Sequence, residues 1–455
     1  HSYAHVPGNS HPRSTFMMPN GCKTTMDAGY LVPVGIYEVY PGDTFECKVA
    51  GSARLATPIT PYMDNQYFEL HAHYMPNRLA WEHWENFMGA REPDPDSTID
   101  YIIPQIVAPA MTGAVNGTLW DYMSYPTQVA SLSASALPFR MYNLCWNQWY
   151  RDENLQDSVV VDIDDAASDY TDYELLRRGK RKDYFTSGLP EPQKGAAVDI
   201  PLLGTAPVGG DGTNPTFKPN AGTPASFGLS SVLATPNIIS NGLNFTNATG
   251  INWDNPHLVA DLSAATGASI NDFRLAVATQ QLLEIDMRGG TRYVELLKAH
   301  FNVISPDFRL QRVEFLGGIQ SDVIVTPVAQ TSETAGTPLG NLAAIGTVGF
   351  ANRHLFTKSF VEHGIIMILA NVRADLNYQQ GLNRSWSRMT RYDYYFPTFA
   401  NLGEQAVLNK EIYAQGPGAI NPSTSVPYDE EVLGYQEPWG DLRTCLLYTS
   451  DAADE

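Results

Sequence analysis

Short apolar stretches of strand length, separated by proline, glycine and aspartate, are the feature that most restricts the fold of this 455-residue chain. Residues 44–49 alternate apolar and polar side chains, as a half-buried strand does, and a turn signal at Pro41-Gly42-Asp43 precedes them. The strongest apolar run, residues 365–370, has the length of a strand and is too short to cross a bilayer. With 36 glycines and 31 prolines to form turns, the pattern predicts a mainly β protein.

The best helical pattern lies well inside the chain. Residues 270–287 have an apolar face, Gly289 and Gly290 follow as a stop signal, and Thr291 is placed to cap a second helix. Strand-like runs precede this part and return after residue 311. The order predicts one β-sandwich whose long loop and helical insertions connect the strands.

Two shorter helices are also expected. One covers residues 77–89, where Trp81 and Trp84 fall on one apolar stripe that needs a partner surface. The other covers residues 141–151, which are rich in aromatic side chains.

Changes in composition divide the chain into segments. The insertion at 201–260 is dense in small and polar residues and carries three charges, on Asp211, Lys218 and Asp254. Its low charge and scattered aromatic residues argue against a fully disordered tail, which leaves an ordered protrusion and a flexible linker as alternatives. The expected organisation is an extended N-terminal arm (1–30), a first part of the sandwich with loops (31–200), the variable insertion (201–260), and a helical insert with the remaining strands (261–444).

The formal net charge of −20 excludes a dedicated DNA-binding domain, which would be basic, and limits nucleic-acid contact to local patches. One dense basic cluster is present, and two aromatic residues that could stack on unpaired bases follow it. The alternative is that this cluster balances the acidic stretch at 152–172. The candidate DNA-facing residues are Arg177, Arg178, Lys180, Arg181, Lys182, Tyr184 and Phe185.

Metal sites and catalytic motifs receive little support. His71 and His73 would point the same way from a strand, as metal ligands of cupin enzymes do, but Asn77-Arg78 stands where a carboxylate should follow. Asp162, Asp164 and Asp165 lack the glycine and glutamate of an EF-hand loop. We therefore expect no catalytic residue, no metal and no cofactor. A carbohydrate-binding or carbohydrate-active β-sandwich would also suit the aromatic, acidic composition and stays open as an alternative.

Ordered blocks of the sequence resemble the major capsid protein of gokushoviruses, within the microvirus group. On the N-terminal side they are residues 21–33, 41–45, 53–58, 63–65 and 76–79, with Trp81, Trp84 and residues 87–89. In the middle they are residues 176–181, 183–187, 288–293, 305–306 and 309–312. On the C-terminal side they are residues 372–376, 378–384, 386–387, 390–393, 402–416 and 433–437. The region 201–260 matches only in being a variable insertion.

The resemblance implies a single viral jelly roll and a structural role without enzymatic activity. It implies self-assembly into a small icosahedral shell that encloses circular single-stranded DNA. The expected partners are copies of the chain, other virion proteins, the DNA genome on the interior, and a host cell-surface receptor contacted by 201–260. The resemblance also implies a virion capsid location, with assembly in the bacterial host cytoplasm and no membrane insertion.

Candidate contacts between subunits follow from this expectation. They are the arm 1–30 and the aromatic residues Trp81, Trp84, Tyr394, Tyr395 and Phe396. For the last three, which lie in the aromatic stretch 392–399, core packing is the alternative use. Residues 445–455 read like a translated sequencing adapter. We expect them not to be native and the chain to be truncated at its C-terminus.

Overall fold

The computed structural model divides into two compact units, residues 1–192 with 286–455, and residues 193–285. The described residues are 12–56, 64–90, 101–198, 208–210, 216–219, 227–228, 251–255, 258–260, 270–333, 336, 338–400 and 402–444. Part of the expected N-terminal arm, most of the insertion 201–260 and the expected adapter-derived residues 445–455 lie outside them.

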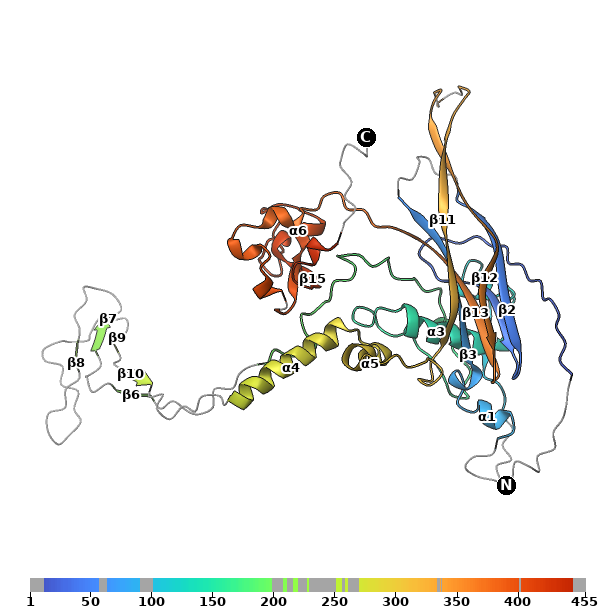
Figure 1. The fold of residues 1–455 in the computed structure, drawn as a ribbon, viewed down its shortest axis with the longest axis horizontal. Coiled ribbons are helices and arrows are strands. Elements are labelled where there is room, and N and C mark those ends of the chain that lie inside the picture. Colours follow the sequence, from blue (N-terminus) through green and yellow to red (C-terminus); the bar gives the residue numbers. More distant parts are fainter. Residues whose placement is uncertain are drawn as a thin grey trace. The chain divides into compact units, whose positions relative to one another are not determined.

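A six-stranded antiparallel sheet forms the centre of the first unit (Figure 1). In spatial order its strands are β1 (Val32–Val39), β13 (Gly364–Ala374), β3 (Gln66–Pro76), β11 (Glu314–Ala329), β12 (Leu342–Ser359) and β2 (Thr44–Arg54). β1 and β2 follow each other in the sequence but occupy opposite edges. The backbone amide of Gly42 donates to Phe360, and Phe360 donates to Asp43, so the β1–β2 turn lies against the β12–β13 turn.

This arrangement curls the sheet, and it confirms the predicted mainly β, jelly-roll class. The core inside the curl joins strands from both edges of the sheet. The Phe360 ring lies 4.5 Å from the Tyr74 ring and 6.0 Å from the Phe45 ring, between centroids. The sandwich is therefore made by one sheet folding over its own apolar face.

β13 is buried on both faces, which explains why its sequence is a continuous apolar run. Ile366 and Ile368 belong to the core inside the curl, whereas Ile365 and Met367 belong to a second core on the outer face. Helix α3 (Leu137–Cys145), which continues into a π-helical turn (Trp146–Tyr150), supplies much of this outer core. The expected helix at 141–151 thus begins earlier than the pattern indicated.

The expected single helix at 77–89 is wrong. A 3-10 turn, η2 (Asn77–Leu79), and one short turn, α1 (Trp84–Phe87), replace it. The buried guanidinium of Arg140 donates to the carbonyl oxygen of Ala80, between the two turns. The same side chain binds the carbonyl oxygens of Asp164 and Ala166, so tertiary contacts override local helix propensity here.

The helical insert agrees closely with the sequence pattern. α4 (Ile270–Arg288) has nearly the expected bounds, and α5 (Tyr293–Phe301) follows the Gly289-Gly290 stop. Residue Arg292, rather than Thr291, occupies the N-cap of α5.

The remaining elements of the first unit are short. They are β4 (Gln105–Val107), α2 (Leu119–Tyr122), β5 (Ser133–Ser135), η4 (Tyr170–Asp172), η5 (Arg384–Ser387), η6 (Arg391–Asp393), η7 (Pro397–Phe399), β14 (Gln405–Leu408), α6 (Asn409–Ile412), η8 (Tyr428–Glu430), β15 (Val432–Gln436) and η9 (Gly440–Leu442). β14 pairs with β15 in a small C-terminal lobe.

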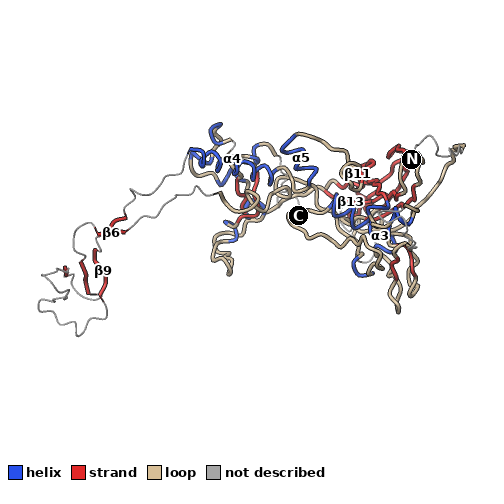
Figure 2. Tube along the Cα trace, turned by 90° about the horizontal axis from the view of Figure 1, so that it is seen from below, coloured by secondary structure: helices blue, strands red, loops and turns tan. Residues whose placement is uncertain are grey.

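The second unit contains paired strands within the predicted insertion (Figure 2). β6 (Val208–Gly210) pairs with β10 (Leu258–Ala260), so the chain enters and leaves the segment between them on neighbouring strands. A separate sheet has β7 (Thr216–Pro219) between β8 (Phe227–Gly228) and β9 (Ile251–Asn255).

Candidate functional site

The basic cluster is attached to the edge of the large sheet by its backbone. Arg178 donates its amide to the carbonyl of Gly29 at 2.9 Å, and Leu31 donates to Leu176 at the same distance. The side chain of Asn371 in β13 donates to the carbonyl of Tyr30, which holds this pairing against the sheet. The cluster therefore begins at a fixed position rather than on a free loop.

Two arginines of the cluster point inward to carboxylates. Arg178 pairs with the buried Glu69 of β3, and Arg373 of β13 pairs with the same carboxylate at 2.8 Å. Burial alone would raise the pKa of Glu69, but its hydrogen bond with Arg373 and the charges of Arg178 and Arg373 outweigh burial and lower it. Arg181 Nε lies 3.0 Å from an oxygen of Asp375. These arginines are structural ion-pair partners.

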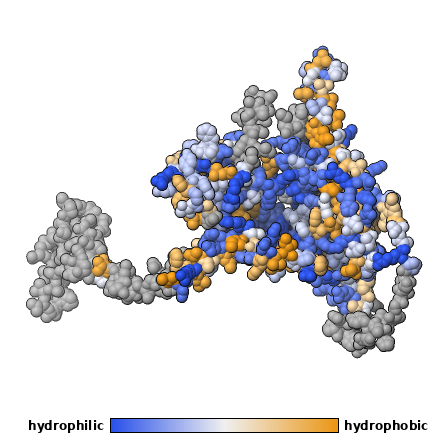
Figure 3. Space-filling model, in the orientation of Figure 1, coloured by the Kyte–Doolittle hydropathy of each residue, from blue (hydrophilic) through white to orange (hydrophobic). Residues whose placement is uncertain are grey.

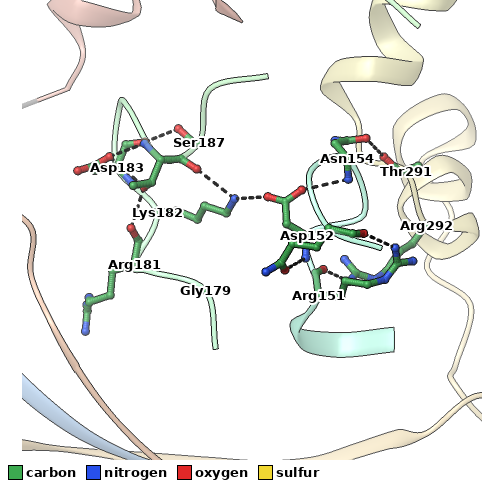
Figure 4. Close-up of polar contacts among 12 residues, drawn as sticks. Arg151, Asp152, Asn154, Gly179, Arg181, Lys182, Asp183, Ser187, Thr291 and Arg292 are labelled. Carbon is green, nitrogen blue, oxygen red and sulfur yellow. Dashed lines mark hydrogen bonds and ion pairs between the residues drawn. The ribbon is translucent and has the colours of Figure 1, made fainter. Parts of the chain in front are cut away.

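The other three cations of the cluster are exposed to solvent. Arg177 donates to the hydroxyl of Tyr30 at 3.0 Å, and Lys180 and Lys182 extend from the loop that follows. Lys182 Nζ lies 3.3 Å from an oxygen of Asp152, and its side chain is 65% exposed (Figure 4). An exposed ion pair of this kind is weak and can exchange for a phosphate.

Tyr184 and Phe185 do not have the open ring faces that base stacking requires. They are 4% and 7% exposed and pack with Val407 of the C-terminal lobe. Burial raises the pKa of Tyr184 to about 12. Their place in the core of the lobe argues against the predicted contact of these rings with DNA.

Asp183 directs the two rings inward, a role that the sequence analysis did not assign. One of its carboxylate oxygens accepts hydrogen bonds from the amides of Phe185 and Thr186, at 2.9 and 2.8 Å. The other oxygen accepts from the hydroxyl of Tyr378. An aspartate that precedes a turn by two residues is a signal for this local structure.

The candidate subunit contacts also divide into buried and exposed residues. Trp81 is fully buried, and its indole donates to Asp165 at 2.6 Å, so its place in the subunit core argues against the predicted contact with another copy. Trp84 is partly buried against the outer core. The three remaining aromatic candidates are exposed: Tyr394 at 55%, Tyr395 at 50% and Phe396 at 38%.

His71 and His73 share one partner, the hydroxyl of Tyr150, at 3.1 and 2.8 Å. Burial is the main cause that lowers the pKa of His71 to about 4 and of His73 to about 3, which keeps both rings neutral. Both imidazoles thus bind the Tyr150 hydroxyl in the place where a metal ion would have to lie. Within the described ranges, no group of three or more His, Cys, Asp or Glu side chains is placed to hold a metal ion.

The acidic residues considered for calcium also have separate partners. Asp162 accepts from the hydroxyl of Tyr173 at 3.2 Å, Asp164 accepts from the amide of Ala166 at 3.2 Å, and Asp165 binds Trp81. Among the helices of the described part of the chain, none is long and apolar enough to cross a membrane.

Comparison with known proteins decides the family. The family model described as "Capsid protein (F protein)" matches residues 4–449. The chain belongs to this capsid protein family. It is 45% identical to capsid protein VP1 of Bdellovibrio phage phiMH2K, with 97% of this chain and 83% of the relative aligned. It is 38% identical to capsid protein VP1 of Chlamydia phage 1 and 36% identical to that of Spiroplasma virus 4, with 84% and 82% of those chains covered.

The resemblance to gokushovirus-type major capsid proteins is thereby confirmed, and the protein is a structural component of a phage capsid. The family and its relatives give no support to the carbohydrate-active alternative.

Proposed function

We propose that this capsid protein assembles with copies of itself and with other virion proteins into a small icosahedral shell around circular single-stranded DNA, without catalysing a reaction. Assembly takes place in the cytoplasm of the bacterial host and involves no membrane insertion. The observation that supports the proposed DNA contact is that the basic cluster has an anchored part and an exposed part. Arg178 and Arg181 are anchored to carboxylates, whereas Arg177, Lys180 and Lys182 remain exposed.

The exposed cations suit a polyanion that is bound without regard to sequence. Ammonium and guanidinium groups neutralise phosphates and release counterions, which makes binding depend on salt. The anchored arginines fix the position of these charges, because they tie the loop to Glu69 of β3 and to Asp375, which follows β13. DNA contact through this surface is electrostatic, since Tyr184 and Phe185 are buried.

The DNA contact is tested by replacing Arg177, Lys180 and Lys182 with Gln in the full-length protein. Shells should form, but less DNA should be packaged. For a single-stranded oligonucleotide, the slope of log affinity against log salt should fall by about 2, since each lost phosphate contact on a single strand contributes about 0.7. The matched control replaces the exposed cations Lys23, Arg54 and Arg309. Normal packaging and an unchanged salt slope in the cluster variant would reject this role.

The insertion 201–260 is the proposed receptor-contacting projection. Pairing of β6 with β10 supports this proposal, because a segment that starts and ends at one place can be added to a shell protein without altering its core. Deleting residues 211–257 and joining the strands by a short glycine turn should leave shells intact and reduce attachment to host cells. Loss of shells in this variant would assign the insertion a structural role instead.

A further inference from the structure

One long stretch of this acidic protein is almost free of charge. Between Asp322 and Arg353 lie 30 residues, of which Glu333 alone is charged, whereas 17% of the whole chain is charged. Those at 323–329 and 342–352 form the far halves of β11 and β12. A solvated hairpin on a protein of net charge −20 would ordinarily carry charges on its exposed face.

The far half of this hairpin extends beyond its neighbours in the sheet. β3 pairs with β11 as far as Val323, and β2 pairs with β12 as far as Thr347. From there, residues 324–329 pair with residues 342–347 as a two-stranded ribbon among the described strands. Two-stranded ribbons are marginally stable alone in water, so this ribbon benefits from a covering surface.

The ribbon has one face that is covered close to the sheet and one open face. Nearer the tip, Pro327, Ala329 and Leu342 on the first face are exposed as well. On the inner face Ala344 is fully buried, and Leu55 packs against Gly346 after donating its amide to the Gly346 carbonyl. The outer face is formed by three directly opposed pairs, Ile324 with Thr347, Thr326 with Ile345, and Val328 with Ala343.

The apolar side chains of the outer face are well exposed. Ile324 is 66%, Ile345 42% and Val328 41% exposed. Figure 3 shows hydrophobic residues along the projecting hairpin. None of the six side chains on this face is charged or aromatic. Single-stranded DNA binds to cations and stacking rings, so its chemistry does not fit this surface.

A second copy of the same chain does fit. Identical copies that each carry a net charge of −20 repel one another, and the repulsion is least where the facing surfaces are uncharged. The cores of interfaces between identical subunits are depleted of charge and enriched in apolar side chains. We propose that the outer face of the distal β11–β12 ribbon docks onto a second copy of this chain in the shell. This inference rests on the proposed shell assembly and names one surface through which copies of the chain contact each other.

The first test measures protection of the ribbon. Val328→Cys is introduced into the full-length protein in a background in which every cysteine except the buried Cys145 is replaced by Ser, because Cys22 is exposed and Cys47 is only partly buried. The Val328→Cys thiol should react with a maleimide at least about tenfold more slowly in shells than in free subunits. The control, Met111→Cys, tests a side chain that is 95% exposed outside the ribbon. Equal reactivity of the Val328→Cys thiol in shells and in free subunits would overturn the docking surface.

The second test places charge on the ribbon. Ile324→Lys with Ile345→Lys should lower the yield of shells at least about tenfold while the circular dichroism of free subunits stays unchanged. Met111→Lys with Val361→Lys, at positions 95% and 83% exposed, should leave the yield unchanged. If the ribbon variant forms shells at the wild-type yield, the docking surface is wrong, but the proposed shell assembly is not affected. Failure of the wild-type protein to form particles would reject the proposed shell instead.

Discussion

Arg373 Nη2 lies 2.8 Å from Glu69 Oε2 and joins two neighbouring strands of the curled sheet. Arg178 binds the same carboxylate from the basic cluster, and Arg181 approaches it at 3.8 Å. One buried negative charge thus connects β3, β13 and the loop that we propose to face DNA. The position of the exposed cations therefore depends on an ion-pair network. Two of its members, Arg178 and Arg181, were predicted from the sequence to face DNA.

Removing that charge should destabilise the subunit. Glu69→Gln leaves Arg178 and Arg373 close together without a neutralising carboxylate, so the free energy of unfolding should fall by about 3–5 kcal/mol. Chemical denaturation of free subunits measures the change. Glu46→Gln, at an exposed pair with Lys48, should leave it nearly unchanged, because exposed ion pairs contribute little to stability. Equal losses in the two variants would show that the Glu69 network is not structural.

Acid should destabilise the subunit in a pH range set by the paired histidines. In the unfolded chain both rings take up protons near pH 6.5, whereas in the folded chain His71 and His73 have pKa values of about 4 and about 3. Stability is therefore greatest above pH 6.5 and falls as the pH drops from there toward 4, by about 1.4 kcal/mol per pH unit for each histidine.

Urea denaturation at pH 7 and pH 5 measures this loss. His71→Gln with His73→Gln should remove most of the slope, whereas His354→Gln, at an exposed histidine, should retain it. Glu69 contributes at lower pH, because its pKa is below the ordinary value and its stabilising charge is lost only under more acidic conditions. An unchanged slope in the double variant would exclude the histidines as its cause.

Trp81 should behave as a core residue. Trp81→Ala removes a fully buried ring and the hydrogen-bond donor to Asp165, so the unfolding free energy of free subunits should fall by about 3–5 kcal/mol. The loss should appear in unassembled protein by thermal or chemical denaturation. A defect confined to shell formation, with subunit stability unchanged, would restore Trp81 as a contact between copies.

The exposed aromatic residues should show the opposite pattern. Tyr394→Ala with Tyr395→Ala should change subunit stability by about 1 kcal/mol, since both rings are at least half exposed. Shell formation, followed by sedimentation velocity, should decrease if these rings meet a second copy. Tyr40→Ala, at a ring exposed to 55%, is the matched control. Normal assembly of the double variant would remove this segment from the set of subunit contacts.

The sequence predicted those features that depend on neighbours in the chain. Alternation in residues 44–49 and the apolar run at 365–370 became strands, and α4 has almost the expected bounds. Which cations of the basic cluster are buried in ion pairs could not be predicted, because their partner Glu69 lies more than 100 residues before the cluster in the chain. Likewise, Val407, which covers Tyr184, lies far away in sequence.

The pairing of β6 with β10 has a consequence for how such proteins diversify. Because the two ends of the intervening segment meet on adjacent strands, its length and content can change while the span that the host chain must bridge stays the same. Under the proposed role of the insertion, whole projections can therefore be exchanged without re-optimising the curled sheet. If the insertion is the projection that we propose, the same junction is a graft point for displaying foreign peptides on the particle surface.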